Sequence, residues 1–183
     1  DRVSRGLGDV YKRQILSWSR KNKINCYASK FTTKVFCEKS KVGIQEGARN
    51  LRYNWFNELR VIHKFDYIVT AHHLDDQLET YLINSMRGSG LKGLLGIPET
   101  TNNLFRPLLQ VLKEEILVYA EINKIDFRED SSNSKNDYYR NMIRNSIIPE
   151  FKKFDDNVML KSKTTVNNLI CLLYTSDAAD DAH

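Results

Sequence analysis

The stretch Thr70–Gly93, TAHHLDDQLETYLINSMRGSGLKG, decides the fold, because it joins a short apolar run to a helix start crowded with ionisable groups. The residues that lead into it, FDYIVTA at Phe65–Ala71, are β-branched and aromatic, as is typical of a buried strand in a parallel sheet. We expect a helix to follow at once, over Asp75–Met86, with Gly88 ending it. A strand that leads directly into a helix indicates an α/β fold.

Two carboxylates, Asp76 and Glu79, lie three residues apart and therefore share one face of this helix near its N-terminus. In open α/β sheets, ligands bind at this position, just past the carboxyl end of a strand. The same pair could serve only to compensate the helix dipole, and Asp75 could be only the helix cap. A metal site built from HHxDDxxE is disfavoured, because His72 and His73 point in opposite directions if they continue the strand.

Strand and helix patterns alternate along the rest of the chain, which indicates a parallel sheet. In chain order we expect helix 15–21, strand 25–30, a linker at 31–41, helix 42–63, strand 66–71, helix 75–86, loop 88–103 and helix 112–123. After a polar turn at 129–133 we expect a helix over 136–148 and another beyond 155, with Pro149 interrupting them.

The composition agrees with a protein that binds nucleic acid but does not identify one. The 183 residues carry a formal net charge of +5, which suits an RNA partner. No apolar run approaches the length of about 18 residues that a membrane span requires, so no membrane partner is expected. The three cysteines, Cys26, Cys37 and Cys171, are widely spaced, which disfavours a disulfide framework or a CxxC metal site and fits a reducing cytoplasm.

Three arginines have both a structural and a functional interpretation. Arg52 lies on an amphipathic helix over Ile44–Ile62, where it could belong to an ordinary solvated face. Arg140 and Arg144 lie four residues apart on a later helix. They can therefore present one positive surface to phosphate, substrate or RNA, or simply keep that face soluble.

Five blocks, in order, resemble the PP-loop ATP pyrophosphatases, and among them the tRNA(Ile)-lysidine synthase family. The blocks are GIQEGARNLRY (43–53), AHHLDDQLET (71–80), MRGSGLKGLLGIPE (86–99), FRPLL (105–109), and EDSSN with YYRNMIRNSIIP (129–149). The resemblance spans about residues 15–168. It implies an incomplete Rossmann-like domain, similar to adenine nucleotide alpha hydrolases, at 15–133, and a helical extension at 134–171.

The resemblance also implies a reaction. ATP, assisted by Mg²⁺, would adenylate the oxygen on carbon 2 of the wobble cytidine in a tRNA(Ile) with a CAU anticodon. The side-chain amine of free lysine would then displace AMP and give lysidine. Such chemistry needs anions that orient an ammonium, a proton acceptor, and cations that stabilise phosphate charge.

The family pattern implies these roles for individual residues. The catalytic set is Asp76, Glu79, His72 and Arg52; the substrate-binding set is Asp76, Glu79, Arg140 and Arg144; ATP is bound by Arg52 and Arg144; tRNA is contacted by Arg87, Lys92 and Arg106; no metal ligand is assigned. The tRNA-contacting residues bracket the glycine-rich segment 88–93, which we expect to be flexible.

One expected motif is missing: the family's phosphate loop, SGGxDS, does not occur in this sequence. We therefore expect an N-terminally truncated fragment that is inactive by itself, with non-native tails at 1–14 and 172–183. A PP-loop tRNA thiolase is an alternative, although it would normally need a cysteine pair. A non-catalytic fragment that binds nucleotide or tRNA is another. A homodimer is left open.

Overall fold

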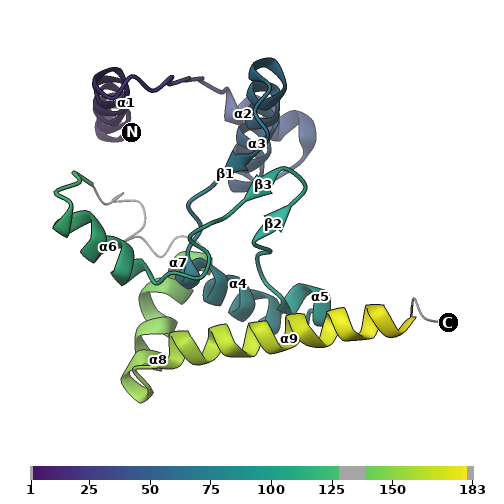
Figure 1. Ribbon diagram of the computed structural model, residues 1–183. Coiled ribbons are helices and arrows are strands. Elements are labelled where there is room, and N and C mark those ends of the chain that lie inside the picture. Colours follow the sequence, from purple (N-terminus) through teal and green to yellow (C-terminus); the bar gives the residue numbers. More distant parts are fainter. Residues whose placement is uncertain (1, 128–138, 181–183) are drawn as a thin grey trace. The chain divides into compact units, whose positions relative to one another are not determined.

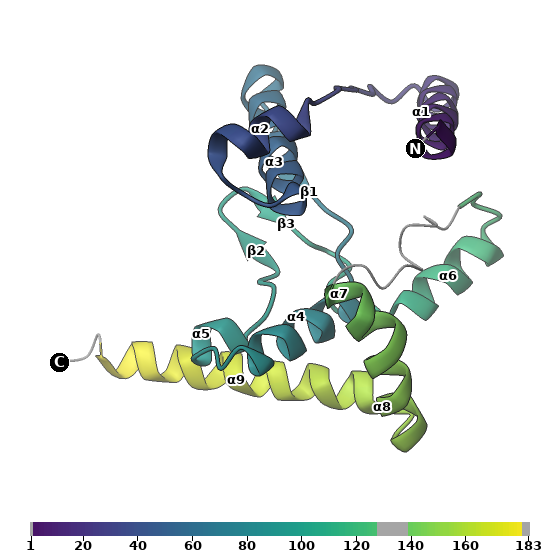
Figure 2. The same ribbon diagram turned by 180° about the vertical axis from the view of Figure 1, so that it is seen from behind.

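The computed structural model describes residues 2–127 and 139–180, and within them the side chains of 12–127, 139–173 and 175. The chain divides into two units, unit 1 (residues 1–58) and unit 2 (residues 59–183), with the boundary inside a long helix. Figures 1 and 2 show the elements of both. The helices are α1 (Arg2–Lys21), α2 (Thr33–Ser40), α3 (Ile44–His63), α4 (Leu74–Met86), α5 (Leu91–Leu94), α6 (Lys113–Ile122), α7 (Tyr139–Met142), α8 (Ile148–Phe154) and α9 (Val158–Asp180). The strands are β1 (Ile68–Val69), β2 (Thr100–Thr101) and β3 (Leu104–Phe105).

In unit 1, helices α2 and α3 approach each other closely at Gly47. A Cβ added at Gly47 would lie 2.3 Å from the Sγ of Cys37, so this contact leaves no room for a larger residue. An aromatic contact involves the same helix: Trp55 of α3 packs edge-on against Phe31, with ring centroids 6.0 Å apart. The second glycine of the GIQEGARNLRY block, Gly47, therefore has a packing role between two helices.

The expected strand 25–30 is wrong for the described structure, because residues 24–32 form neither strand nor helix. A strand is stable only when a neighbour pairs with its backbone N–H and C=O groups, and its sequence alone cannot supply that neighbour. The expected linker at 31–41 is also wrong in part, because it contains α2.

The sheet of unit 2 is small and mixed. Strand β3 lies in the middle, parallel to β1 and antiparallel to β2, with Ile68 opposite Leu104 and Thr100 opposite Phe105. The expectation of a wholly parallel sheet is therefore corrected. The expected loop 88–103 contains α5 and β2, and the FRPLL block begins inside β3. Strands β2 and β3 are each two residues long, which is too short to produce a recognisable strand pattern in the sequence.

Helices α4, α5 and α9 pack together, and both views show α9 running alongside α4 and α5. Leu78 of α4 meets Ile143, Ile148 and Met159 in the main hydrophobic cluster. The expected stop of α4 is confirmed: Gly88 has φ +68°, its N–H donates to Ser85 O, and Ser89 N–H donates to Asn84 O. Among the helices of residues 2–127 and 139–180, none combines the length and apolar character needed to cross a membrane.

The expected break at Pro149 is also wrong. A five-residue π-helical turn, η2 (Ile143–Ile147), joins α7 to α8, and Pro149 lies in the first turn of α8. Proline has no N–H and its ring crowds the carbonyl one turn earlier, so a regular helix would be disrupted here. The π turn widens the backbone hydrogen-bond pattern just before Pro149, because Ile148 N–H donates to Ile143 O, five residues back. The expected turn at 129–133 lies outside the described residues.

Candidate active site at the start of helix α4

Helix α4 begins directly after the segment that leads out of β1. His73 is its N-cap residue, in an extended conformation, and the backbone N–H of His73 donates to Oδ2 of Asp76 at 3.0 Å. Asp76, the third residue of the helix, thus accepts a hydrogen bond from the backbone N–H of the N-cap residue, as in the reciprocal half of a capping box. The expectation that Asp75 caps this helix is therefore corrected.

Asp75 instead caps a different helix. Its Oδ2 accepts a hydrogen bond at 2.9 Å from the backbone N–H of Lys113, the first residue of α6. Next to it, Leu74 N–H donates to Val111 O at 2.9 Å, so the starts of α4 and α6 are joined. Burial raises the pKa of Asp75, but the hydrogen bonds from His73 and Lys113 outweigh it and lower the pKa below its ordinary value of 3.8.

Asp76, Glu79, Arg140 and Arg144 meet in one place, which we call the charge cluster. Glu79 has no exposed surface. Its Oε2 accepts hydrogen bonds from Arg140 Nε at 2.6 Å and from Arg144 Nη2 at 2.9 Å, and its Oε1 accepts one from Arg144 Nε at 2.5 Å. Both carboxylate oxygens of Glu79 therefore already bind guanidinium groups.

Asp76 is held less tightly by the same arginines. Its Oδ1 lies 3.4 Å from Arg140 Nη2 and 3.3 Å from Arg144 Nη2, which are long distances for charge-assisted hydrogen bonds. Arg140 Nη2 also reaches the backbone oxygen of Asp76 at 3.2 Å, and Thr80 Oγ1 donates to that oxygen at 2.8 Å. Oδ1 of Asp76 is thus the carboxylate oxygen of the cluster with the weakest partners.

The charge cluster contains two carboxylates and two guanidiniums, so its formal charges balance. Burial lowers the pKa of Arg144, but the hydrogen bonds and negative charge of Glu79 reverse this and raise it. Arg144 is part of the π turn η2 and Arg140 is part of α7. The structure therefore brings together all four residues expected to bind substrate, with the positive charge of both arginines directed at the carboxylates.

The two other expected catalytic residues are His72 and Arg52. His72 precedes α4, and its Nδ1 lies 2.9 Å from Oγ1 of Thr70. Arg52 belongs to unit 1, on α3, where it is exposed and its guanidinium lies 5.9 Å from the ring centre of Tyr53. The hydrogen bonds described above do not join His72 to the charge cluster.

The residues expected to contact tRNA do not share one environment. Arg87 and Lys92 are exposed. Arg106 is buried, and its Nη1 donates to Pro98 O at 2.5 Å and lies 3.4 Å from Thr101 Oγ1. The grouping of Arg106 with the exposed pair is therefore corrected, because its side chain holds the chain after α5 in place.

Sequence reasoning missed Gln77, a buried residue that follows Asp76 directly. Its Nε2 donates to Leu95 O at 2.9 Å, and its Oε1 accepts from Ile97 N–H at 2.6 Å. Gln77 thus binds the chain just after the glycine-rich segment to α4, and Asn84 Nδ2 donates to Gly93 O within the segment, which we expected to be flexible. The available signal was the polar amide at a helix position whose neighbours, Leu74 and Leu78, are apolar.

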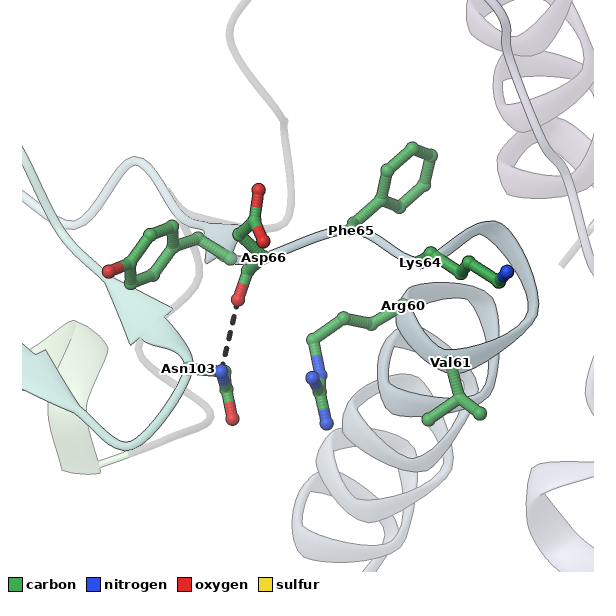
Figure 3. A pocket seen from close by; sticks show the side chains of 7 residues that line it. Arg60, Val61, Lys64, Phe65, Asp66 and Asn103 are labelled. Carbon is green, nitrogen blue, oxygen red and sulfur yellow. Dashed lines mark hydrogen bonds between the residues drawn. The ribbon is translucent and has the colours of Figure 1, made fainter.

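A separate pocket of about 410 Å³ lies at the opposite end of β1, lined by the end of α3, the residues before β1 and Asn103. Figure 3 shows Arg60 extending from α3 into this space and the hydrogen bond from Asn103 Nδ2 to Asp66 O, which is 3.0 Å long. None of the expected site residues lines the pocket. The described residues contain no group of three or more His, Cys, Asp or Glu side chains arranged to hold a metal ion.

The chain belongs to the PP-loop domain family, whose sequence profile matches residues 5–151. It is similar to several curated tRNA(Ile)-lysidine synthases. Identity is 36% over 156 residues with that of Porphyromonas gingivalis, 35% over 158 residues with that of Bacteroides thetaiotaomicron, and 33% over 150 residues with that of Bacillus subtilis. These matches cover 84%, 86% and 80% of this chain, but 34%, 37% and 32% of the relatives. The chain thus spans about a third of the length of the curated relatives that it matches.

Proposed function

We propose that the protein carrying this chain ligates lysine to the wobble cytidine of a tRNA(Ile) with a CAU anticodon and so forms lysidine. The cytidine oxygen on carbon 2 attacks the α-phosphate of ATP and pyrophosphate leaves. The lysine amine then attacks carbon 2 and AMP leaves. The observation that supports this proposal is the charge cluster at the start of α4, in a chain similar to tRNA(Ile)-lysidine synthases.

The contacts in the cluster favour different tasks for its two carboxylates. Oδ1 of Asp76 has long contacts, and the Asp76 side chain is 14% exposed, so it can accept a hydrogen bond from the lysine ammonium. Glu79 is fully buried and saturated by two arginines. We therefore assign amine capture to Asp76, and assign to Glu79 the orientation of Arg140 and Arg144.

The two arginines are the cations of this site. Their side chains are 37% and 29% exposed, respectively, so part of each guanidinium can meet negative charge on a substrate. Guanidinium groups already fixed in place stabilise developing phosphate charge without reorganising during the reaction. Arg144, and Arg52 of unit 1, are the proposed ATP contacts, and His72 is the proposed proton acceptor for the amine.

Mg²⁺ is proposed as a companion of ATP. The carboxylates of Asp76 and Glu79 already have guanidinium partners, so they are poor ligands for the ion in this arrangement. Mg²⁺ is commonly held by nucleotide phosphates and water with few protein ligands. Arg87 and Lys92 remain the proposed tRNA contacts. A tRNA substrate implies a cytoplasmic location, and a homodimer stays a prediction.

The alternative of a tRNA thiolase has less support. A thiolase would normally use a pair of cysteines, whereas the three cysteines of this sequence, Cys26, Cys37 and Cys171, are widely spaced and form no CxxC. The names of the similar curated proteins also favour the ligase.

The test is AMP release by the protein produced from its complete gene. ATP and a CAU-anticodon tRNA are supplied with lysine, with ornithine, or with a sulfur donor. We expect AMP release and a tRNA product heavier by one lysine residue with lysine only. AMP release that requires the sulfur donor would show that the ligase assignment is wrong.

A further inference from the structure

One face of α4 holds the glycine-rich segment through two side-chain amides. Gln77 and Asn84 lie seven residues apart, which is two helical turns, and therefore share a face. Asn84 Nδ2 donates to Gly93 O at 2.8 Å, and Gln77 bonds to Leu95 O and Ile97 N–H. Together they make three hydrogen bonds to the backbone of residues 93–97. These bonds fix both the end of α5 and the turn after it.

The turn is shaped to receive Gln77. Gly96 has φ +70°, a backbone conformation that favours glycine, and a Cβ at this position would lie 2.8 Å from Oε1 of Gln77. A side chain at Gly96 would therefore displace the amide. The side-chain amide of Gln77 can donate and accept at the same time. Its Nε2 donates to Leu95 O, and its Oε1 accepts from Ile97 N–H. Glutamate could not donate to Leu95 O, and methionine would fill the space without either bond.

This arrangement connects two parts of the proposed function. Gln77 is adjacent to Asp76, in the turn of α4 that carries the charge cluster. The bound residues 93–97 directly follow the exposed cation Lys92 of α5, and α5 in turn follows the exposed Arg87. At its far end, Arg106 holds the segment through Pro98 O. The exposed cations and the carboxylate-bearing turn are therefore parts of one hydrogen-bonded framework within unit 2.

We propose that Gln77 is a positioning residue, which keeps the RNA-contacting segment, residues 87–97, in fixed register with the charge cluster. RNA phosphates that bind Arg87 and Lys92 would then place the target base at a constant distance from Asp76. A small misplacement of reacting groups is enough to slow an oriented reaction strongly. This inference rests on the proposed function, because it takes the RNA to be the substrate whose base reacts beside Asp76.

The experiment compares Gln77→Met and Gly96→Ala with two matched controls, in the protein produced from its complete gene. Gly90→Ala changes a glycine of the same segment that has open space around its Cβ position and φ −66°. Asn103→Ala removes an exposed hydrogen bond, donated by a side-chain amide, elsewhere in unit 2. The measurements are amide exchange at Ile97, the Kd for unmodified tRNA, and separate KM and kcat values for tRNA and lysine.

For Gln77→Met we expect faster exchange at Ile97, and a Kd and KM for tRNA about five- to tenfold higher, with the lysine KM within about twofold. Gly96→Ala should act in the same direction. The double variant should be less impaired than the product of the two single effects, because both remove the same contact. Both controls should stay within about twofold of the unaltered protein.

Unchanged tRNA Kd and KM, despite accelerated exchange at Ile97, would show that Gln77 only supports the fold and would overturn the inference. An equal rise of the KM for tRNA and the KM for lysine in Gln77→Met would overturn the inference as well. If the unaltered protein binds tRNA but gives no lysine-dependent AMP release, the proposed reaction is wrong. A selective loss of tRNA affinity in Gln77→Met would in that case still support the positioning of the RNA-contacting segment.

Discussion

Arg144 donates from Nε to Oε1 of Glu79 at 2.5 Å, and this contact joins residues that are 65 positions apart in the sequence. One partner lies on a regular helix and the other in a π turn. Since the carboxylate is completely buried, its charge depends on this arginine and on Arg140 for compensation. The site and the stability of unit 2 therefore depend on the same contact.

The first prediction concerns Glu79→Gln, which removes the buried negative charge that compensates the guanidinium groups of Arg140 and Arg144. Removal of one partner from a buried ion pair is strongly destabilising, so we expect the free energy of unfolding to fall by about 3 kcal/mol. Urea denaturation measures this change. Glu114→Gln is the control, because Glu114 is 73% exposed in its pair with Lys152, and it should cost less than about 1 kcal/mol. Equal losses would contradict the assignment of Glu79.

The second prediction concerns Asp76→Asn. Loss of a charge-assisted contact to the lysine ammonium should cost about 1.5 to 3 kcal/mol, seen as a raised KM for lysine. Adenylation of tRNA in the absence of lysine, measured as pyrophosphate release, should suffer less. If both steps fall by the same factor, Asp76 serves ATP or a metal ion and does not capture the amine.

The third prediction concerns the acid sensitivity contributed by Asp75. Its pKa is lowered in the folded chain, so its carboxylate stabilises the fold at any pH above the unfolded pKa of about 3.9. That contribution is lost as the pH falls through the folded-state pKa. Asp75→Asn retains an oxygen that can accept from Lys113 N–H but removes the titration.

We therefore expect the unaltered protein to lose more free energy of unfolding than Asp75→Asn between pH 6 and pH about 3. Urea titrations at the two pH values give this difference directly. The same pH dependence in both proteins would show that Asp75 is not stabilised by the contacts at the start of α6.

The fourth prediction tests the contact between α2 and α3. Gly47→Ala would bring a Cβ to 2.3 Å from Cys37 Sγ, so the helices must separate, at a cost of about 1 to 3 kcal/mol. Gly43→Ala is the matched control, because nothing lies within 4 Å of the Cβ position there. Thermal unfolding should show a lower Tm for the first variant only. A similar Tm for both variants would contradict the close approach.

The sequence was most informative where the controlling interactions are local. Helix α4, its stop at Gly88 and the shared face of Asp76 and Glu79 follow from spacing within one element. The sequence also placed Arg140 and Arg144 on one helical surface. It could not show that this surface faces Glu79, because that pairing depends on how two distant segments pack.

The errors have a common physical origin in long-range contacts. Asp75 looked like a cap for its own helix, but its partner is 38 positions away. Arg106 looked like a surface cation, but the chain folds back over it and supplies Pro98 O. Residues 25–30 had the composition of a strand but no neighbouring strand in the described structure. Each outcome was decided by a partner that the local pattern does not contain.

The π turn before Pro149 changes which residues can face the same way. Ile143 and Ile148 both belong to the main hydrophobic cluster, although they are five positions apart. At about 100° per residue in an α-helix, five positions would leave their side chains about 140° out of phase. The wider turn corrects this phase difference, so Arg140 and Arg144 reach Glu79 while Ile148 still reaches the core. It acts as a one-residue insertion retained inside a helix, and deleting one residue from 145–147 should turn either the arginines or the isoleucine away from its partners.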